Sequence, residues 1–354
     1  MSDGSWIDPT QTLGITMEAT TEIPGRAHRP NQPTLSILIV NWHAARFLKP
    51  CLASIYAHVQ GLAFEVIVID NGSFDGSAAL ISSEFPDVRF VQSHTNLGFA
   101  QANNLAFSHA RGEYILLLNP DTELMDDAVT AMLGYLTSVR QVGAVGCCLL
   151  NSDYTVQWKY VQAFPTLVNQ LLAIESLQRA FPQWRMWGLR PVLDYDGTPS
   201  DVDVLAGSCL MLKRAVFEQI GLFDSQYYMY GDDVDLCYRL RKAGYSIRYL
   251  GSKKIVHHGG ASAAFREETE FATVMQRESR LKFFRKTHGE TYAQLYRAST
   301  GIAAVVRLSV ILLMVPLSSL LVERHRLAAG ARKWWSILRW ALGMESWAAN
   351  AGIK

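Results

Sequence analysis

Acidic residues in this chain directly follow apolar runs that predict β-strands, and this placement constrains the possible fold more than any other feature. In an open α/β sheet, ligands bind outside the carboxyl ends of the strands. A chain that brings several carboxylates to that edge builds a site for a cation or a polyol, which indicates an enzyme handling a metal-bound nucleotide. The three clearest runs are residues 67–69 before Asp70-Asn71-Gly72-Ser73, residues 116–118 before Asn119-Pro120-Asp121, and residues 228–230 before Gly231-Asp232-Asp233-Val234-Asp235.

Strands and helices alternate along the first half of the chain. The apolar run over 35–40 is of the kind that is buried on both faces of a parallel sheet. This β-α-β-α order continues to about residue 146 and predicts an α/β fold with a Rossmann-like, mostly parallel central sheet and flanking helices. By their apolar spacing, further strands are expected over 64–69, 88–91 and 114–118, and helices over 47–59 and 99–110.

Charge and cysteine content argue against two classes of function. The net charge is +1 with 18% charged residues, so no global field favours nucleic acid and we expect no nucleic-acid partner. The five cysteines include no C-x-x-C pair, which weakens zinc and redox interpretations and fits reduced, buried thiols. Residues 1–33 are rich in Thr, Pro and Gly without periodicity, and we expect a disordered leader with no signal peptide.

The alternation changes after residue 150, where a region rich in Trp, Arg and Pro begins. An apolar stretch over 204–212, broken by Gly207-Ser208, begins a second catalytic half. A strand over 246–250 precedes the segment that contains His257-His258-Gly259-Gly260. Helices are expected over 232–243 and 266–288.

The C-terminal part of the chain predicts contact with a membrane. Residues 301–322 are apolar but are interrupted by Arg307 and Pro316, and basic residues and tryptophans follow them. Length alone permits a membrane span, and a helix packed on the catalytic core is a further alternative. We favour helices that lie on the membrane surface or re-enter it, because flanking Arg and Trp suit an interfacial position.

Three parts are therefore expected: a leader over 1–33, a catalytic domain over 34–290, and apolar or amphipathic membrane-associated helices over 291–354. The basic flank of the C-terminal helices would face anionic lipid in the cytoplasmic leaflet. We accordingly expect a peripheral or monotopic protein on the cytoplasmic side of the cell membrane.

Each acidic motif has a structural interpretation beside the functional one. The run from Asp70 to Ser73 is ordinary turn chemistry, although Asp70 could accept hydrogen bonds from a base or a ribose. Asp121 could bridge a divalent ion to a nucleotide diphosphate, and equally it could cap the helix that follows. Asp232, Asp233 and Asp235 suit the dipole at a helix start, yet three carboxylates exceed what capping needs. One of them could take a proton from an attacking hydroxyl.

The pair His257-His258 closes an expected strand beside flexible glycines. A neutral imidazole there could complete a metal site or contact a phosphate. Taken alone, a pair of ordinary loop histidines is the favoured interpretation.

Together these segments resemble the family 2 glycosyltransferases with a GT-A fold, in the rhamnosyltransferase-like branch that acts on cell-surface polysaccharides. The resemblance covers residues 35–290, and the ordered set of motifs is specific although each motif alone is not. The segments that carry it are 36–42, 68–77, Asn96-Leu97-Gly98-Phe99-Ala100 with Ala102-Asn103-Asn104, Asn119-Pro120-Asp121-Thr122, 207–211, Tyr230-Gly231-Asp232-Asp233-Val234-Asp235 with Arg239, and His257 with Gly259, Gly260 and Ser262.

The resemblance implies a role for each matching residue. Asp233 would be the catalytic base, and Asp121 with His257 would hold Mg²⁺ or Mn²⁺ and the diphosphate. Gly207 and Ser208 would lie near the donor sugar and the acceptor, with Asp232 contacting the acceptor. The nucleotide would be bound by Val40, Asn41 and Asp70 at its base and ribose, and by Asn71, Asn96, Gly98, Asn103 and Asn119 elsewhere.

Two positions depart from the family pattern. Asn119 stands where many members have Asp, which leaves one carboxylate in the metal motif. Asp232 stands where the residue before the base is usually Glu, so its side chain is shorter by one methylene.

The expected function is inverting, metal-dependent transfer of a sugar, rhamnose from dTDP-rhamnose, to a lipid-linked or polysaccharide acceptor in cell-surface glycan synthesis. One alternative is a nucleotidyltransferase, which would need a basic or Gly-rich triphosphate cradle where the chain offers Asn41-Trp42-His43 with Arg46. Another alternative is a catalytically inactive carbohydrate-binding or scaffold protein. The leading interpretation requires Asp121, Asp233 and His257 to converge on one pocket.

Overall fold

The computed structural model describes residues 32–157, 160–172, 181, 184, 198–259, 270–315 and 324–351. From Pro33 onward the chain forms one compact unit. The expected leader lies outside these ranges except for residues 32 and 33. Parts of the Trp-rich region after residue 150, of the glycine segment after His257 and of the apolar stretch over 301–322 also lie outside them.

The predicted α/β fold with a mostly parallel sheet is confirmed. In the nine-stranded sheet β1, β2, β3, β4, β6 and β11 run in one direction, and β5, β8 and β10 run against them. The strands lie in the order β3 (Arg89–Ser93), β2 (Phe64–Asn71), β1 (Leu35–Asn41), β4 (Tyr114–Leu118), β10 (Cys209–Lys213), β6 (Val142–Leu150), β11 (Ser246–His257) and β5 (Thr122–Leu124), with β8 (Ser200–Asp201) paired to β11.

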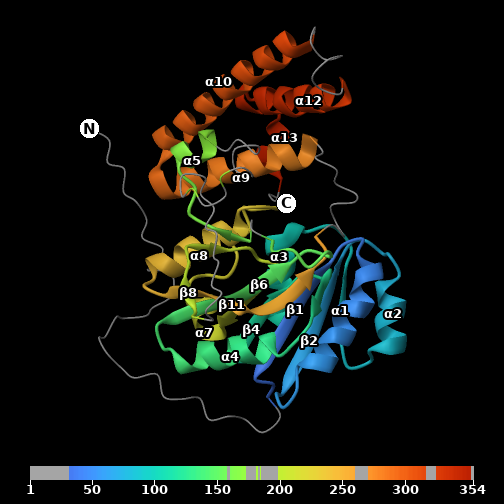
Figure 1. The fold of residues 1–354 in the computed structure, drawn as a ribbon. Helices are drawn as coiled ribbons and strands as arrows, with labels where there is room; N and C mark the ends of the chain where they lie inside the picture. The colour runs from blue at the N-terminus through green and yellow to red at the C-terminus, as the bar shows by residue number, and fades with distance from the viewer. Residues whose placement is uncertain are drawn as a thin grey trace, which may run out of the picture. The chain divides into compact units, whose positions relative to one another are not determined.

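Helices cover this sheet because the apolar strands must be buried on both faces. Helix α3 packs on β1 and β2, and α4 packs on β6 and β11 (Figure 1). The helices of this part are α1 (Ala45–His58), α2 (Ser77–Glu84), α3 (Gly98–His109), α4 (Ala128–Ser138), α7 (Arg214–Gln219) and α8 (Asp232–Lys242).

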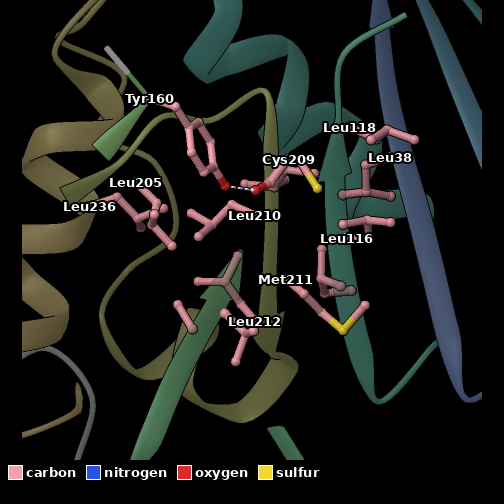
Figure 2. Packing of buried hydrophobic residues seen from close by; sticks show 14 of the residues in the cluster. Leu38, Leu116, Leu118, Tyr160, Leu205, Cys209, Leu210, Met211, Leu212 and Leu236 are labelled. Carbon is pink, nitrogen blue, oxygen red and sulfur yellow. Dashed lines mark hydrogen bonds between the residues drawn. The ribbon is translucent and has the colours of Figure 1, made fainter. Parts of the chain in front are cut away.

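Strand β10 lies antiparallel between β4 and β6, and this position sets where the turn before it, with Gly207 and Ser208, is held. The backbone amide of Asn119 donates to the carbonyl of Ser208 over 2.9 Å, so the turn before β10 lies beside the end of β4. Figure 2 shows the residues of β10 packed between β4 and Tyr160, whose hydroxyl donates to the carbonyl of Cys209. Gly146 leaves room for that hydroxyl, since a Cβ there would come within 2.2 Å of it.

The C-terminal helices gather together in Figure 1. Glu278 and Trp340 are buried, and the indole Nε1 donates to the carboxylate over 2.8 Å, which joins α12 to α9. Gly289, with a φ of 87°, separates α9 from α10. The elements of this part are α9 (Glu270–His288), α10 (Glu290–Met314), α12 (Arg324–Ala341) and α13 (Ser346–Asn350), together with α5 (Leu167–Leu171), which contacts α10. The strand pair β7 (Val161–Gln162) and β9 (Val204–Leu205) belongs to the sheet region, where β9 contacts α8 and β11.

Helix α10 exposes much of its apolar surface. Among the described residues it is the one helix long and apolar enough to cross a membrane, and only 11% of its apolar window is buried. The side chains of Ile302, Leu312 and Leu313 are 67%, 71% and 74% exposed. A large exposed apolar surface of this kind marks an interaction site for membrane or protein.

A glycine at position 98 is required where α3 begins. Its φ is +79°, and a Cβ would lie 2.2 Å from the carbonyl oxygen of Tyr228, which accepts the Phe99 amide over 2.9 Å. We expect Gly98→Ala to lower the free energy of unfolding by more than the about 1–2 kcal/mol that a left-handed φ alone costs. Denaturant unfolding measures this loss.

Gly134→Ala is the matched control, because Gly134 lies in α4 and a Cβ added there would meet nothing within 4 Å. Alanine there should raise the free energy of unfolding by about 0.5–1 kcal/mol. Equal effects of the two substitutions would contradict the close approach of residues 98 and 228.

Candidate functional site

A cavity of about 330 Å³ opens at the carboxyl ends of β1, β2 and β4, where the acidic motifs were expected to meet. Asp121, Asp233 and His257 all line it, although they are far apart along the chain. Its lining residues are Val40, Trp42, Asn71, Asn96, Phe99, Asn119, Pro120, Asp121, Ala206, Gly207, Ser208, Met229, Tyr230, Asp232, Asp233 and His257.

Antiparallel pairing of β5 with β11 brings Asp121 to His257. The register sets Thr122 opposite His257, and the amide of His258 donates to the carbonyl of Asp121 over 2.8 Å. The Nε2 atom of His257 consequently lies 3.3 Å from Oδ1 of Asp121 and 3.2 Å from Nδ2 of Asn119. Asp121 is 5% exposed, so this contact is shielded from solvent.

Gln157 fixes the protonation of the His257 ring. Its side-chain Nε2 donates to the His257 carbonyl over 2.5 Å, which turns the amide oxygen toward the ring, 2.9 Å from Nδ1. Because an amide oxygen only accepts hydrogen bonds, Nδ1 carries the proton. In the neutral ring Nε2 then accepts a hydrogen bond from Nδ2 of Asn119 over 3.2 Å, and it also lies 3.3 Å from the Asp121 carboxylate.

That arrangement fits a divalent cation. Nε2 and the Asp121 carboxylate oxygen lie 3.3 Å apart, so a divalent ion bound there would take both as ligands in place of the Asn119 donor. A ligating histidine commonly donates its other ring N–H to a carbonyl oxygen, as His257 does to Gln157. The described residues hold no group of three or more metal-binding side chains. Asp121 and His257 would therefore bind the ion together with phosphate oxygens from a substrate.

Asp232 and Asp233 lie at the start of α8, after Tyr230 and Gly231, whose φ values are both positive at 66° and 73°. Burial raises the pKa of Asp233, while nearby Arg280 and the amide of Val234, 2.8 Å from Oδ1, oppose the rise. Burial and the neighbouring Asp233 hold the pKa of Asp232 well above its usual range. A carboxylate with a raised pKa in a cavity suits general-base chemistry.

Asp235 has a different environment from the two acidic residues before it. Its carboxylate is fully buried and pairs with Arg239 and with Lys286 of α9, each over 2.7 Å. It therefore joins α8 to α9 and does not line the cavity described above.

Asn71 and Asn96 line the opposite wall, and their amides are bonded to each other. Nδ2 of Asn71 donates to Oδ1 of Asn96 over 3.0 Å, and Oδ1 of Asn71 accepts the amide of Leu97 over 2.8 Å. Oδ1 of Asn96 also accepts the amide of Gly98 over 2.9 Å. These bonds hold the turn between β3 and α3 against the end of β2.

Four of the expected nucleotide-binding residues are not among the described lining residues of the cavity. Asp70 is fully buried and accepts hydrogen bonds from Asn41, Phe74 and Gln92 over 3.0, 2.9 and 2.6 Å. Gly98 lies against Tyr228, and Nδ2 of Asn103 donates to the carbonyl of Phe99 over 2.9 Å. These residues support the strand and helix ends that form the wall.

Several lining residues were not expected to belong to the site, namely Trp42, Phe99, Pro120, Ala206, Met229 and Tyr230. Each of them directly adjoins an expected site residue or motif in the sequence. Position next to a motif is therefore the sequence feature from which they could have been predicted. Apolar and aromatic walls are usual for ligand cavities, where a few polar groups give specificity.

A second cavity of about 330 Å³ adjoins the first and shares Ala206, Ser208 and His257 with it. Its other walls are polar or small: Asn151, Gln157, Tyr160 and Gly259. The turn before β10 and His257 therefore separate two neighbouring spaces.

Comparison with known proteins agrees with this architecture. The model of the glycosyl transferase family 2 matches residues 36–221. An N-acetylglucosaminyl-diphospho-decaprenol L-rhamnosyltransferase of Mycobacterium tuberculosis is 29% identical over 237 residues, which cover 63% of this chain and 76% of that protein. The rhamnosyltransferase WbbL of Escherichia coli K12 is 27% identical over 234 residues, which cover 63% of this chain and 82% of that protein.

Among solved structures, the mannosyltransferase PcManGT of Pyrobaculum calidifontis in complex with GDP-Man and Mn²⁺ superposes with a TM-score of 0.53. The sequences are 16% identical, and the match covers 89% of this chain and 88% of that one. At this level of identity the likeness concerns the fold, and it confirms the predicted GT-A architecture.

The Asp232 carboxyl predicts a pH-dependent change in stability. Because its pKa is raised above 3.8 in the folded protein, the folded state keeps a proton that the unfolded chain loses as pH rises. Ionisation in the unfolded chain therefore lowers stability above that pH. We expect Asp232→Asn to raise the melting temperature at neutral pH, and the gain should shrink as pH falls toward 3.8.

Thermal unfolding over this pH range measures the effect, with exposed Asp87→Asn as the control. A gain for Asp232→Asn that does not change with pH would contradict the raised pKa.

Proposed function

The chain belongs to the glycosyl transferase family 2, and on this premise we propose that it is an inverting, metal-dependent enzyme that transfers rhamnose from dTDP-rhamnose. The acceptor is a lipid-linked or polysaccharide glycan in cell-surface glycan synthesis. The observation that carries this proposal is the convergence of Asp121, Asp233 and His257 on one cavity.

Asp233 is the proposed catalytic base. Its burial raises its pKa, so its carboxylate binds a proton more readily than an exposed aspartate does. In an inverting transfer, Asp233 takes the proton of the acceptor hydroxyl while that oxygen forms a bond to the anomeric carbon. The bond from that carbon to the nucleotide diphosphate breaks, and the electron pair leaves with the diphosphate.

Asp121 and His257 are the proposed ligands of Mg²⁺ or Mn²⁺. A bound divalent ion supplies neutralising charge for the departing diphosphate. Gln157 keeps the proton on Nδ1 of His257, so Nε2 has a lone pair for a metal ion in place of its bond from the Asn119 amide, 3.2 Å away. Asn119 supplies no charge, so Asp121 is the one carboxylate of this motif.

The opposite wall supports a nucleotide site. Val40, Trp42, Asn71 and Asn96 line it, with polar amides beside an aromatic ring. Asn41, Asp70, Gly98 and Asn103 lie outside the described lining, and we propose that they contribute by holding the strand and helix ends in place. Gly207 lines the first cavity and Ser208 lines both, which supports a position for the donor sugar on one side of Ser208 and the acceptor on the other.

The donor and acceptor classes are supported by the relatives. One of them is a rhamnosyltransferase of a diphospho-decaprenol lipid. The exposed apolar surface of α10 is compatible with membrane association. We therefore propose that the enzyme acts at the cytoplasmic membrane face, with the C-terminal helices after residue 290 on the membrane surface and the catalytic domain before them.

Asp233→Asn should reduce sugar transfer by about 10²–10⁴-fold while leaving donor binding nearly intact, because the amide cannot accept the proton. A nucleotide-release assay with membranes as the acceptor source measures transfer, and it compares dTDP-rhamnose with UDP- and GDP-sugars. Calorimetry measures donor binding. The exposed Asp87→Asn variant is the control for a lost carboxylate.

Near-normal turnover of Asp233→Asn would show that the base is another residue. If the wild-type protein binds a nucleotide sugar with Mn²⁺ but shows no turnover on any acceptor, the protein is a carbohydrate-binding scaffold.

Asp121→Asn should weaken Mn²⁺ binding in the presence of the donor nucleotide, because the neutral amide is a poorer ligand for a hard cation. Gln157→Leu should weaken it by about 10–100-fold, since the histidine ring loses its partner. Electron paramagnetic resonance of Mn²⁺ measures the bound fraction without requiring turnover.

Glu123→Gln is the control for this experiment, because Glu123 pairs with His258 over 2.7 Å and does not line the cavity. If Asp121→Asn and Gln157→Leu both bind Mn²⁺ as the wild type and the control do, Asp121 and His257 are not the ligands.

A further inference from the structure

A small cavity of about 70 Å³ lies among the C-terminal helices, separate from the two cavities at the catalytic site. Pockets for whole small molecules measure about 300–1,000 Å³, so this one admits a single compact group. Helices α5, α9, α10 and α12 form its walls through Gln170, Leu171, Arg277, Tyr296, Thr300, Ala303, Arg307 and Trp334.

Two arginines face this cavity without a carboxylate partner among the residues that the structure describes. Arg277 comes from α9 and Arg307 from α10, and no ion pair joins either of them to a described acidic side chain. The guanidinium of Arg307 lies over the ring of Trp334, 4.1 Å from its centroid. This stacking fixes the orientation of the charge but does not neutralise it.

The positive charges of Arg277 and Arg307 repel each other. Burial lowers the pKa of Arg307, and the nearby Arg277 lowers it further. Two half-buried guanidiniums without a described counter-charge are costly to hold together unless an anion joins them. Arginine donates two parallel hydrogen bonds to phosphate, and paired arginines therefore suit a phosphate group.

The surroundings indicate where that phosphate comes from. Arg307 lies on α10 between Val306, which is 55% exposed, and Val310, which is 48% exposed. The cavity thus lies beside an unpartnered apolar helix surface, and an amphipathic surface with arginines suits the boundary between lipid head groups and acyl chains. An anionic group at this depth belongs to a lipid.

We propose that Arg277, Arg307 and Trp334 form a binding site for one phosphate group of a polyprenyl diphosphate lipid, the carrier on which a lipid-linked acceptor is built. The proposal rests on the membrane-face transfer inferred above.

Helix α9 connects this site to the catalytic cavity. Ser279 donates to the carbonyl of Met229 over 3.0 Å, and Met229 lines the catalytic cavity. Arg280, the next residue, acts electrostatically on Asp233, and Arg277 lies one turn earlier on the same helix. A lipid held at Arg277 and Arg307 is therefore held against the same helix that contacts Met229 and acts on Asp233.

The test uses the full chain, with EDTA present so that no metal at Asp121 captures the phosphate. Binding is measured by flotation with phosphatidylcholine vesicles that contain a polyprenyl diphosphate. Vesicles containing phosphatidylglycerol at the same surface potential report general electrostatic attraction. Inorganic pyrophosphate added without vesicles reports binding of a soluble anion.

We expect the wild type to prefer the polyprenyl diphosphate vesicles. Arg277→Gln and Arg307→Gln should each weaken that binding about tenfold, since each removes charge-assisted hydrogen bonds. Arg332→Gln removes the same charge from an exposed position on α12, outside the cavity, and should leave the preference unchanged. The melting temperature of the two cavity variants should be unchanged or higher, because a like-charge contact is relieved.

Equal binding to both vesicle types, or an equal loss with Arg332→Gln, overturns the proposal in favour of general electrostatic attraction. If free pyrophosphate binds as tightly as the polyprenyl diphosphate vesicles do, the site recognises a soluble anion and the proposal of a lipid ligand is wrong. A fall in melting temperature for both cavity variants assigns the arginines a structural role instead. No donor sugar is used, so failure here leaves the transferase proposal intact, and near-normal turnover of Asp233→Asn would leave this site intact.

Discussion

The pairing of β11 with β5 is the interaction on which the candidate site depends. Strand β11 is parallel to β6 along most of its length, and its last residues pair antiparallel with the short β5. Side chains alternate between the faces of a strand, so a slip of one residue would turn His257 away from Asp121. The register of three residue pairs therefore decides whether a carboxylate and an imidazole share one space.

Much of the fold was predictable because the strands of the first half are uninterrupted apolar runs. Buried strands such as β1 and β4 can be predicted from their continuous apolar residues. The polar turns that follow them indicate the edge of the sheet. The direction of β10 could not be read, because a strand buried on both faces has the same apolar pattern in either direction. Met211 of β10 pairs with Leu116 and Val145, which lie 95 and 66 residues earlier in the sequence, and only tertiary packing selects these partners.

The candidate site was partly predictable for the same reason. The strand expected before Asp121 is present as β4, whereas residues 228–230 before Asp233 form no strand and Asp233 lies at the start of α8. Motifs also do not report burial. Asp70 looks like a ligand-facing residue in the sequence, while in the structure its oxygens are occupied by the protein itself. Within one run of four residues, Asp232 and Asp233 line the cavity and Asp235 pairs with Arg239 and Lys286. Spacing alone cannot separate these environments, because they depend on what α9 places opposite.

The buried hydrogen bond between Trp340 and Glu278 has a consequence for how the C-terminal helices are viewed. Removing the last helices, as is often done to make membrane-associated proteins easier to purify, would expose α9 and leave the Glu278 carboxylate without its donor. Helix α9 also holds Met229 in place, because the Ser279 hydroxyl donates a hydrogen bond to the Met229 carbonyl. The segment after residue 290 is thus part of the framework behind Met229 and the candidate site, and a shortened protein would lose order there.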